Sequence, residues 1–239
     1  MNETPKNLDH ISTQWSAVHD VEHFLVRYSA AVRHYLEALL GKDGDADDVG
    51  QEFFLKVVAN GFVRASPDRG RFRDYLKTAV RNAALTHLRK QQRQPDLMDV
   101  AVLQDTVASA DPDAERRWPA DWRTCLLNRA WRALEVHQQR SPGNLFWTVL
   151  RLSVDHADED STALAARAAE IAGRPLRADA FRQQLRGARL LFAELLVKEV
   201  AQTLESPTSV DVEGELAETG LSLHVVPFLP ADWRERPCW

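Results

Sequence analysis

The chain has 239 residues, which is enough for one large domain or two small ones. Its 44% hydrophobic and 27% charged residues are ordinary for a globular protein and exclude disorder of the whole chain. The net charge of −5 argues against a protein that binds DNA on its own. No apolar run reaches the roughly 18 residues of a membrane helix, and the polar N-terminus does not resemble a secretory signal. With only Cys125 and Cys238, no disulfide framework is expected, and a reducing cytoplasm is favoured.

Apolar residues spaced by three and four predict three helices in the first part of the chain. The first covers residues 21–40 and ends at Gly41, which can adopt a left-handed conformation. The second covers residues 45–60 and has acids in its first turn, where the helix dipole favours negative charge. The third covers residues 71–93, and Pro95 begins an acidic connector.

The second half is also predicted to be helical, because no alternating β pattern competes there. Helices are expected over residues 121–139, with Asp121 as candidate N-cap, and then over 145–154, 162–172 and 178–203. We therefore predict an all-α protein of two small helical modules with a linker and a C-terminal extension of unassigned role. The expected boundaries are 14–94 for the first module, 95–120 for the acidic linker, 121–205 for the second module and 206–239 for the extension.

Charge alternates along the chain. Residues 69–94 hold eight bases and one acid, and residues 173–198 hold six bases and two acids. An acidic, proline-containing connector separates these basic islands, and residues 199–220 hold six acids and no base. Two basic islands on a tether favour two modules that face nucleic acid, although solvated helix faces would produce similar runs.

The first island mixes basic and aromatic residues at the start of the third predicted helix. Arginine and lysine contact phosphates, and aromatic rings stack on unpaired bases for about 1–3 kcal/mol each. This combination is typical of a protein that holds single-stranded DNA, unless Phe72 and Leu76 belong to the core. Asn82 follows in the same helix and offers a donor and an acceptor to a base edge, or is a plain surface residue.

The second island coincides with a helix, a turn at residues 173–177 and a longer helix, the layout of a helix-turn-helix motif. The pattern places Arg182, Gln183 and Arg186 on the exposed side of the longer helix, and Phe181 and Leu185 on its inner side. Arginine and glutamine read base edges in the major groove. Many plain helical hairpins share this pattern.

No catalytic residue, metal site or cofactor is predicted. The run at residues 43–47 imitates the start of a calcium loop, but Asp48 and Phe54 stand where that loop needs Gly and Glu. His19 and His23 are four apart but lack the glutamate of a zinc protease helix. A helical enzyme acting on nucleic acid is therefore disfavoured.

Three strings in the first half jointly resemble a known family. They are D-x-x-D-V-x-Q-E-x-F-L at Asp45 to Leu55, DRGRFRDYL at Asp68 to Leu76 and R-N-x-A-x-x-x-L-R at Arg81 to Arg89. In this order they resemble conserved region two of bacterial RNA polymerase sigma factors of the extracytoplasmic-function class, within the sigma-70 family. The resemblance covers about residues 19–94. Over 121–205 the resemblance to region four rests on the layout and the helix-turn-helix pattern.

The resemblance implies a non-enzymatic sigma factor that binds core RNA polymerase and directs promoter recognition and transcription initiation. The second predicted helix would bind the clamp helices of the largest polymerase subunit through Asp48, Gln51, Glu52 and Phe53. An anti-sigma factor is a further partner that the resemblance allows. The alternative is a sigma-like interaction protein that binds polymerase or a regulator without reading promoters.

The resemblance also implies two sets of contacts with promoter DNA. The set that captures the melted minus-ten strand comprises Arg71, Phe72, Arg73, Tyr75, Lys77, Arg81, Asn82, Thr86, Arg89, Lys90 and Arg93. The set that reads the minus-thirty-five element comprises Arg177, Ala178, Arg182, Gln183 and Arg186.

Overall fold

The computed structural model is helical, and the residues that it describes contain no strand, which confirms the all-α prediction. It divides into two compact units: residues 1–125 with 202–208, and residues 126–201 with 209–239. None of its described helices has the length and apolar content needed to cross a bilayer. The described residues are 21–41, 44–60, 71–91, 114–141, 143–204 and 207–235.

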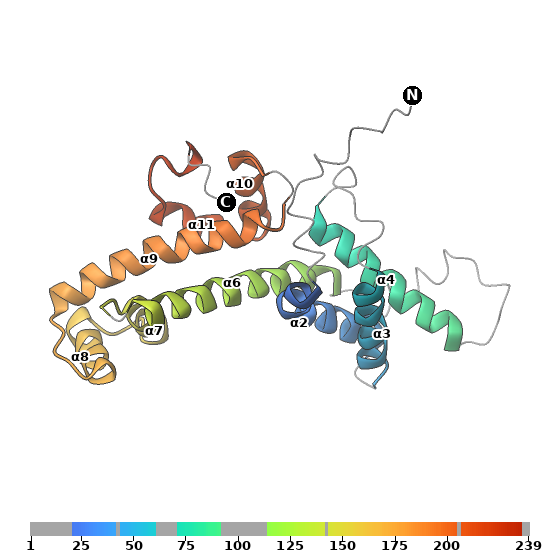
Figure 1. Cartoon of the computed structure of the whole chain (residues 1–239), viewed down its shortest axis with the longest axis horizontal. Coiled ribbons are helices and arrows are strands. Elements are labelled where there is room, and N and C mark those ends of the chain that lie inside the picture. The colour runs from blue at the N-terminus through green and yellow to red at the C-terminus, as the bar shows by residue number, and fades with distance from the viewer. Residues whose placement is uncertain are drawn as a thin grey trace, which may run out of the picture. The chain divides into compact units, whose positions relative to one another are not determined.

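Three helices form most of the first unit (Figure 1): α2 (Val21–Leu40), α3 (Asp45–Asn60) and α4 (Phe72–Gln91). The bounds of α2 and α3 match their predicted ranges. Helix α2 packs against both α3 and α4, which also contact each other. Buried side chains recur on α2 at spacings of three and four, so one stripe of the helix faces the core. They are Tyr28, Val32, Tyr35, Leu36 and Leu39.

The next helix that the structure describes also contributes to this unit, and its predicted start at residue 121 was wrong. Helix α6 (Ala114–Arg140) begins at Ala114, so Asp121 is an interior residue and not an N-cap. Pro119 lies inside the helix, where it removes a backbone hydrogen bond at a cost of about 3 kcal/mol. Burial outweighs that cost, because the Trp118 and Trp122 side chains are 1% and 0% exposed.

The two tryptophans pack on the aromatic residues of the other helices. The Trp122 ring stacks on Tyr28 with the centroids 4.7 Å apart, and the Trp118 ring lies 5.1 Å from Tyr35. Phe72, the first residue of α4, is 6.3 Å from Trp122. The start of α6 therefore belongs to the core of the first unit, although the sequence analysis had assigned residues up to 120 to a linker.

In the second unit, the remainder of α6 is followed by α7 (Phe146–Asp155), α8 (Ser161–Ala172) and α9 (Ala178–Ala201). These bounds lie close to the predicted ranges. Asp160 caps α8 by accepting hydrogen bonds from the backbone N–H groups of Thr162 and Ala163, both at 2.8 Å. Gly173 ends α8 in the left-handed conformation at φ 63°, which permits the turn into α9.

Helix α9 packs on both α7 and α8. Phe181, Val149 and Leu164 lie in their shared core. The approach of α9 to α7 is close at Gly187, where a Cβ atom would lie 2.7 Å from Cζ of Phe146. A larger residue would force the Phe146 ring to shift, so glycine permits this close approach.

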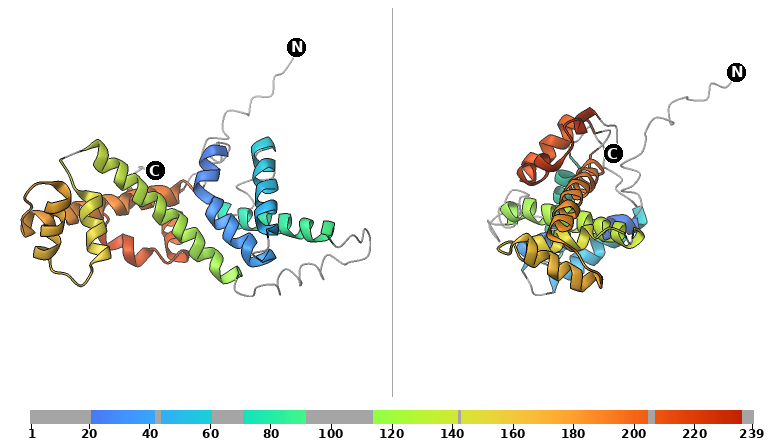
Figure 2. Two further views of the ribbon diagram at one scale, coloured as in Figure 1. Left: turned by 90° about the horizontal axis from the view of Figure 1, so that it is seen from below. Right: turned by 90° about the vertical axis from the view of Figure 1, so that its left-hand side faces the viewer.

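The C-terminal extension is folded and contributes to the second unit. It contains α10 (Ser209–Glu218), α11 (Ser222–Val225) and the 3-10 turns η2 (Val226–Phe228) and η3 (Trp233–Glu235). Both ribbon views place α10 and α11 along α9, and α10, α11 and η2 contact it (Figure 2). Val212, Leu216 and Val225 are buried in this segment, for which the sequence analysis predicted no element.

Candidate polymerase and nucleic-acid surfaces

The predicted polymerase contacts lie on α3. Asp48, Gln51 and Glu52 are exposed there, with spacings that place them on one side of the helix. The predicted contact through Phe53 is corrected by the structure, because the Phe53 side chain is 7% exposed and lies in the core of the first unit. Its position in the helix turns it towards the other helices, so it supports α3 instead of contacting a partner.

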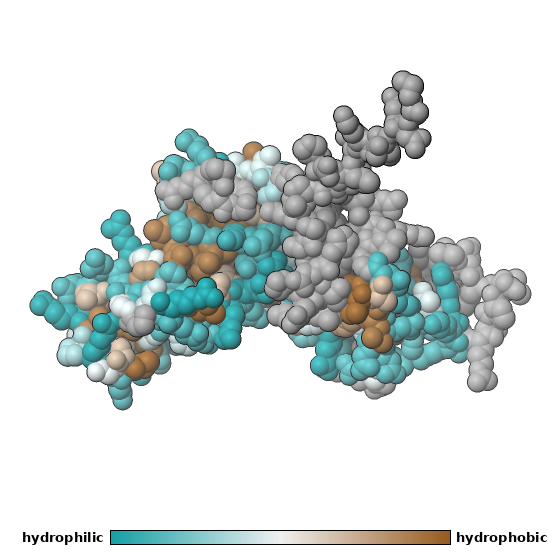
Figure 3. Space-filling view, viewed as in Figure 1, coloured by the Kyte–Doolittle hydropathy of each residue, from teal (hydrophilic) through white to brown (hydrophobic). Residues whose placement is uncertain are grey.

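The same helix exposes two apolar residues that the sequence analysis did not assign to the surface. Leu55 is 67% exposed and Val58 is 51% exposed. Residues 51, 55 and 58 follow the i, i+4, i+7 pattern of one helix face. Apolar atoms gather in the region of α3 in the space-filling view (Figure 3). The surface of α3 is therefore both acidic and apolar, and exposure of these positions could not be decided from periodicity alone.

Glu52 joins the predicted polymerase surface to the predicted DNA surface. Its carboxylate accepts hydrogen bonds from Lys56 Nζ at 2.8 Å and from Lys90 Nζ of α4 at 3.3 Å. These two lysines hold the pKa of Glu52 below its usual range. The charge of Glu52 is thus partly compensated, whereas Asp48 has no basic group within 4.0 Å among the described residues.

The first turn of α4 requires a second correction. Phe72 and Arg73, predicted to hold the melted strand, are 2% and 8% exposed. The Phe72 ring packs 5.5 Å from that of Tyr28, which confirms the core alternative considered for it. Of the neighbouring residues in the same predicted set, Arg71 and Tyr75 are partly exposed. Neither Phe72 nor Arg73 is therefore available to a nucleic acid in this structure.

Further along α4, two predicted DNA contacts lie beside a carboxylate from α6. Lys77 Nζ forms an ion pair with Glu115, and Arg81 Nη1 lies 4.0 Å from the same carboxylate. The Tyr35 hydroxyl also donates to Glu115 at 2.8 Å. Burial and this hydrogen bond raise the pKa of Tyr35, so the hydroxyl keeps its proton.

Glu115 remains ionised despite its position. Its burial would raise the pKa, but the hydrogen bonds from Lys77 and Tyr35 and the charges of Lys77 and Arg81 lower it by more. The pKa of Glu115 consequently lies below the ordinary glutamate range. Glu115 lies in the predicted linker, and the acidic character of that segment does not indicate which partners Glu115 has.

An exposed polar stripe runs along α4 after these residues. Asn82, Thr86 and Arg89 are exposed at spacings of four and three. Thr86 Oγ1 donates to the backbone carbonyl of Asn82 at 2.8 Å, so this bond does not involve the Asn82 side-chain amide. Within the described ranges no carboxylate lies within 4.0 Å of Arg89. Exposed Thr78 extends the stripe, and Arg93 lies outside the described residues.

The predicted minus-thirty-five residues lie at the start of α9 in the second unit. Arg177, Arg182, Gln183 and Arg186 are exposed, and Ala178 is partly exposed. Phe181 is 1% exposed on the inner side, as the pattern predicted. A basic and amide-bearing face is thus present on the longer helix after the turn, as the expected helix-turn-helix layout requires.

Comparison with known protein families agrees with the geometry of the first unit. Residues 24–94 match the family model of Sigma-70 region 2. The match contains all of α3 and α4 and most of α2, and ends before α6. This segment is therefore similar to region 2 of the sigma-70 family, the region of sigma factors that is associated with polymerase binding and promoter melting. No curated protein and no solved structure gives a significant match to the chain.

Proposed function

We propose that the protein is a non-enzymatic sigma factor of the extracytoplasmic-function class, which directs core RNA polymerase to promoters. The carrying observation is the side-by-side placement of two exposed surfaces within the segment that matches Sigma-70 region 2. Helix α3 exposes Asp48 and Gln51, and neighbouring α4 exposes Asn82, Thr86 and Arg89. The first surface would dock on the clamp helices of the largest polymerase subunit, and the second would capture the melted minus-ten strand.

The residues of α4 and α9 would make different kinds of contact with promoter DNA. Flipping a base out of the duplex costs a few kcal/mol, and stacking and hydrogen bonds at the captured base offset this cost. The Asn82 amide can donate to and accept from a base edge, while the Arg89 guanidinium can pair with an adjacent phosphate. The face of α9 that carries Arg182, Gln183 and Arg186 would read the minus-thirty-five element in the major groove.

A second candidate function is a sigma-like interaction protein that binds polymerase without reading promoters. It is favoured by the carboxylates that already contact Lys77, Arg81 and Lys90 within the first unit. In vitro transcription with purified core polymerase on a promoter library tests the two functions. Promoter-specific transcripts that require the protein support the sigma factor, and their absence despite core binding supports the second candidate.

Two exposed aspartates provide matched variants for testing polymerase binding. Asp48→Ala should weaken association with core polymerase by about tenfold or more, since it removes a charge from the docking surface. Asp155→Ala is the control, because Asp155 is an exposed aspartate on α7 of the second unit, where it pairs with Arg151 at 2.8 Å. Equal effects of the two variants on association, measured by surface plasmon resonance, would contradict this surface.

A second pair tests strand capture. Arg89→Ala should reduce open-complex formation by about tenfold, because it removes a charge-assisted hydrogen bond. Lys90→Ala should have a smaller effect, because Lys90 is shared with Glu52. Permanganate footprinting of the melted strand measures both. Full opening by the Arg89→Ala holoenzyme would exclude this residue from strand capture.

A further inference from the structure

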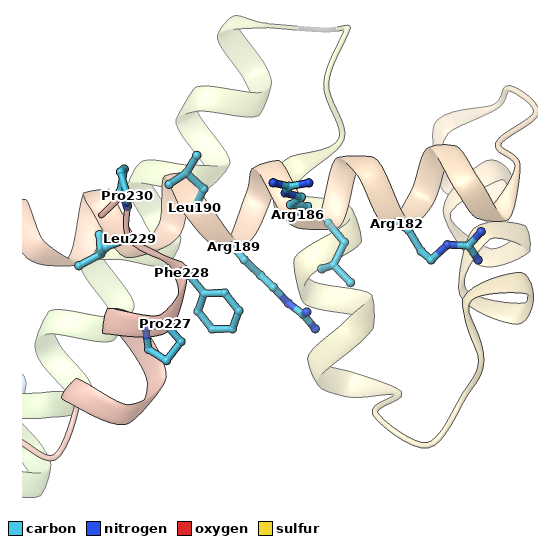
Figure 4. A pocket seen from close by; sticks show the side chains of 9 residues that line it. Arg182, Arg186, Arg189, Leu190, Pro227, Phe228, Leu229 and Pro230 are labelled. Atoms are coloured by element: carbon cyan, nitrogen blue, oxygen red, sulfur yellow. The ribbon is translucent and has the colours of Figure 1, made fainter. Parts of the chain in front are cut away.

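A groove in the second unit lies between α9 and the C-terminal extension (Figure 4). It encloses about 580 Å³. One wall is the face of α9 that carries Arg182, Arg186, Arg189 and Leu190, and the other wall is the segment Pro227–Pro230. All of these elements belong to the second unit.

The α9 wall carries three arginines in one row. Arg182, Arg186 and Arg189 are exposed, and their spacings of four and three place them on one face of the helix. Arg182 Nη1 donates to Ser161 Oγ at 2.8 Å. Across the described parts of the chain, no carboxylate lies within 4.0 Å of any of the three guanidinium groups. A backbone hydrogen bond lowers the pKa of Asp179, and Asp179 is close enough to Arg182 for the arginine charge to help lower that pKa. Arg186 and Arg189, by contrast, present positive charge with no adjacent carboxylate among the described residues.

The opposite wall is apolar and touches the last arginine of the row. The Phe228 ring is 40% exposed, and the guanidinium carbon of Arg189 lies 5.5 Å from its centroid. This is the distance of a cation–π contact, which holds the Arg189 side chain beside the groove. In the close-up view, Arg189 extends alongside the Phe228 ring (Figure 4). Prolines 227 and 230 flank this ring in sequence and keep the wall free of long polar side chains.

We propose that this groove binds the backbone of double-helical DNA and that the C-terminal extension is part of the DNA-binding surface. This proposal rests on the proposed function of α9 and adds two contact residues to it, Arg189 and Phe228. A DNA strand alternates charged phosphates with apolar deoxyribose faces, which matches a groove with an arginine wall and an apolar wall. Arg189 pairs with a phosphate, and Phe228 acts as a positioning residue that also contacts sugar.

The length of the arginine row and the residue next to it favour DNA over an acidic protein segment as the ligand of the groove. From Arg182 to Arg189 the axis of α9 rises by about 10 Å, at about 1.5 Å per residue, which corresponds to about three base-pair steps. The row is continuous with Gln183, whose amide can both donate to and accept from a base edge, whereas a carboxylate of an acidic peptide could use only its donors. The proposed groove therefore extends the predicted reading face of α9 along the same duplex.

The test measures binding of the full-length chain to a fluorescein-labelled DNA duplex of mixed sequence, by fluorescence anisotropy over a range of low salt concentrations. Arg189→Gln should raise the Kd by about tenfold and reduce the slope of log Kd against log salt by about one. Phe228→Ala should raise the Kd by less than Arg189→Gln does. Phe228→Tyr should bind like the wild type, because it keeps the aromatic ring in the wall. Arg132→Gln is the matched control, since Arg132 lies on α6 and pairs with Glu135.

Several results would overturn the proposal. It is wrong if the wild-type chain does not bind the duplex at low salt, or if Arg189→Gln binds like wild type or like Arg132→Gln. Thermal unfolding curves that overlay the wild-type curve would show that the variants are folded. If a glutamate-rich peptide with a central phenylalanine binds, and only its binding is lost in Arg189→Gln and Phe228→Ala, the groove takes a protein ligand instead. Because this assay contains no polymerase, failure of the transcription assay alone would reject the proposed function and leave the groove assignment standing.

Discussion

The two basic islands of the chain differ in how many of their basic side chains lie beside a carboxylate. On α4 of the first unit, Lys77 and Arg81 lie beside Glu115, and Lys90 lies beside Glu52. On α9 of the second unit, Arg182 and Arg186 have no carboxylate within 4.0 Å among the described residues. The positive charge of α4 is therefore partly neutralised by carboxylates, whereas Arg182 and Arg186 of α9 form no ion pair within the described part of the chain.

This difference shows that a run of basic residues does not by itself define a surface for nucleic acid. The carboxylate of Glu115 comes from the start of α6, which is held in place by the burial of Trp118 and Trp122. A DNA strand that binds Lys77 must compete with that carboxylate. On α9 the nearest carboxylate, Asp179, pairs with Arg177 at 3.3 Å. Among the described residues, no carboxylate lies within 4.0 Å of Arg186 or Arg189. The first island is consequently suited to binding that depends on polymerase, and the second to direct contact.

The largest effect is expected from removing the core contact that places Glu115 beside α4. Trp122→Ala should lower the free energy of unfolding of the first unit by about 3–5 kcal/mol, because it opens a cavity beside Tyr28 and Phe72. Urea unfolding followed by far-ultraviolet circular dichroism measures this. The exposed Leu223 provides the control variant Leu223→Ala. A loss below about 1 kcal/mol would mean that α6 does not belong to the core of the first unit.

Two helical glycines, one in each unit, differ in the space beside them. Gly187→Ala should destabilise the second unit by about 1–3 kcal/mol, because the new Cβ atom would lie 2.7 Å from Cζ of Phe146. Gly50→Ala should stabilise the first unit by about 0.5–1 kcal/mol, since its Cβ atom would meet Leu36 Cδ1 at an ordinary 3.5 Å. Thermal unfolding measures whether each variant is less or more stable than the wild type. If both variants gain or both lose stability, the packing described at one of the two sites is contradicted.

A smaller effect should follow from removing the competing charge on α4. Glu115→Gln removes the carboxylate charge beside Lys77 and Arg81, so the affinity of the full chain for single-stranded DNA should rise by about fivefold at most, the limit for a partly exposed ion pair. Anisotropy with a labelled oligonucleotide at low salt measures the change. Glu135→Gln removes a comparable pair with Arg132 on the same helix and should have no effect. Unchanged or weaker binding by Glu115→Gln would show that Glu115 does not restrain α4.

The smallest effect concerns pH. The pKa of Glu115 is lower in the folded protein than its usual value, so its stabilising contribution is present at neutral pH and is lost as the pH falls through the folded pKa. The first unit of the wild type should therefore lose stability below about pH 4 more steeply than Glu115→Gln does. Urea unfolding at a series of pH values compares the two proteins, and parallel curves would contradict the assignment.

Local periodicity was sufficient to predict most helices of this protein. The bounds of α2 and α3 follow from apolar spacing and an acidic first turn, because these signals lie within the helix itself. The identification of Asp48, Gln51, Asn82 and Arg89 as surface candidates also came from local strings, and the structure exposes all four.

Burial and pairing were decided only by the tertiary structure. Phe53, Phe72 and Arg73 have the residue types of a binding surface but lie in the core, because the surrounding helices cover them. The start of α6 at Ala114 could not be predicted from a segment with Pro119 and many charges, since its stability comes from tryptophans buried against distant helices. The wall that Phe228 forms beside Arg189 likewise joins residues far apart in the chain. Contacts over such separations leave no periodic signal. Sequence alone therefore determined the helices whose signals are local, α2 to α4 and α7 to α9, while packing determined the start of α6, the helices of the C-terminal extension and which side chains remain available.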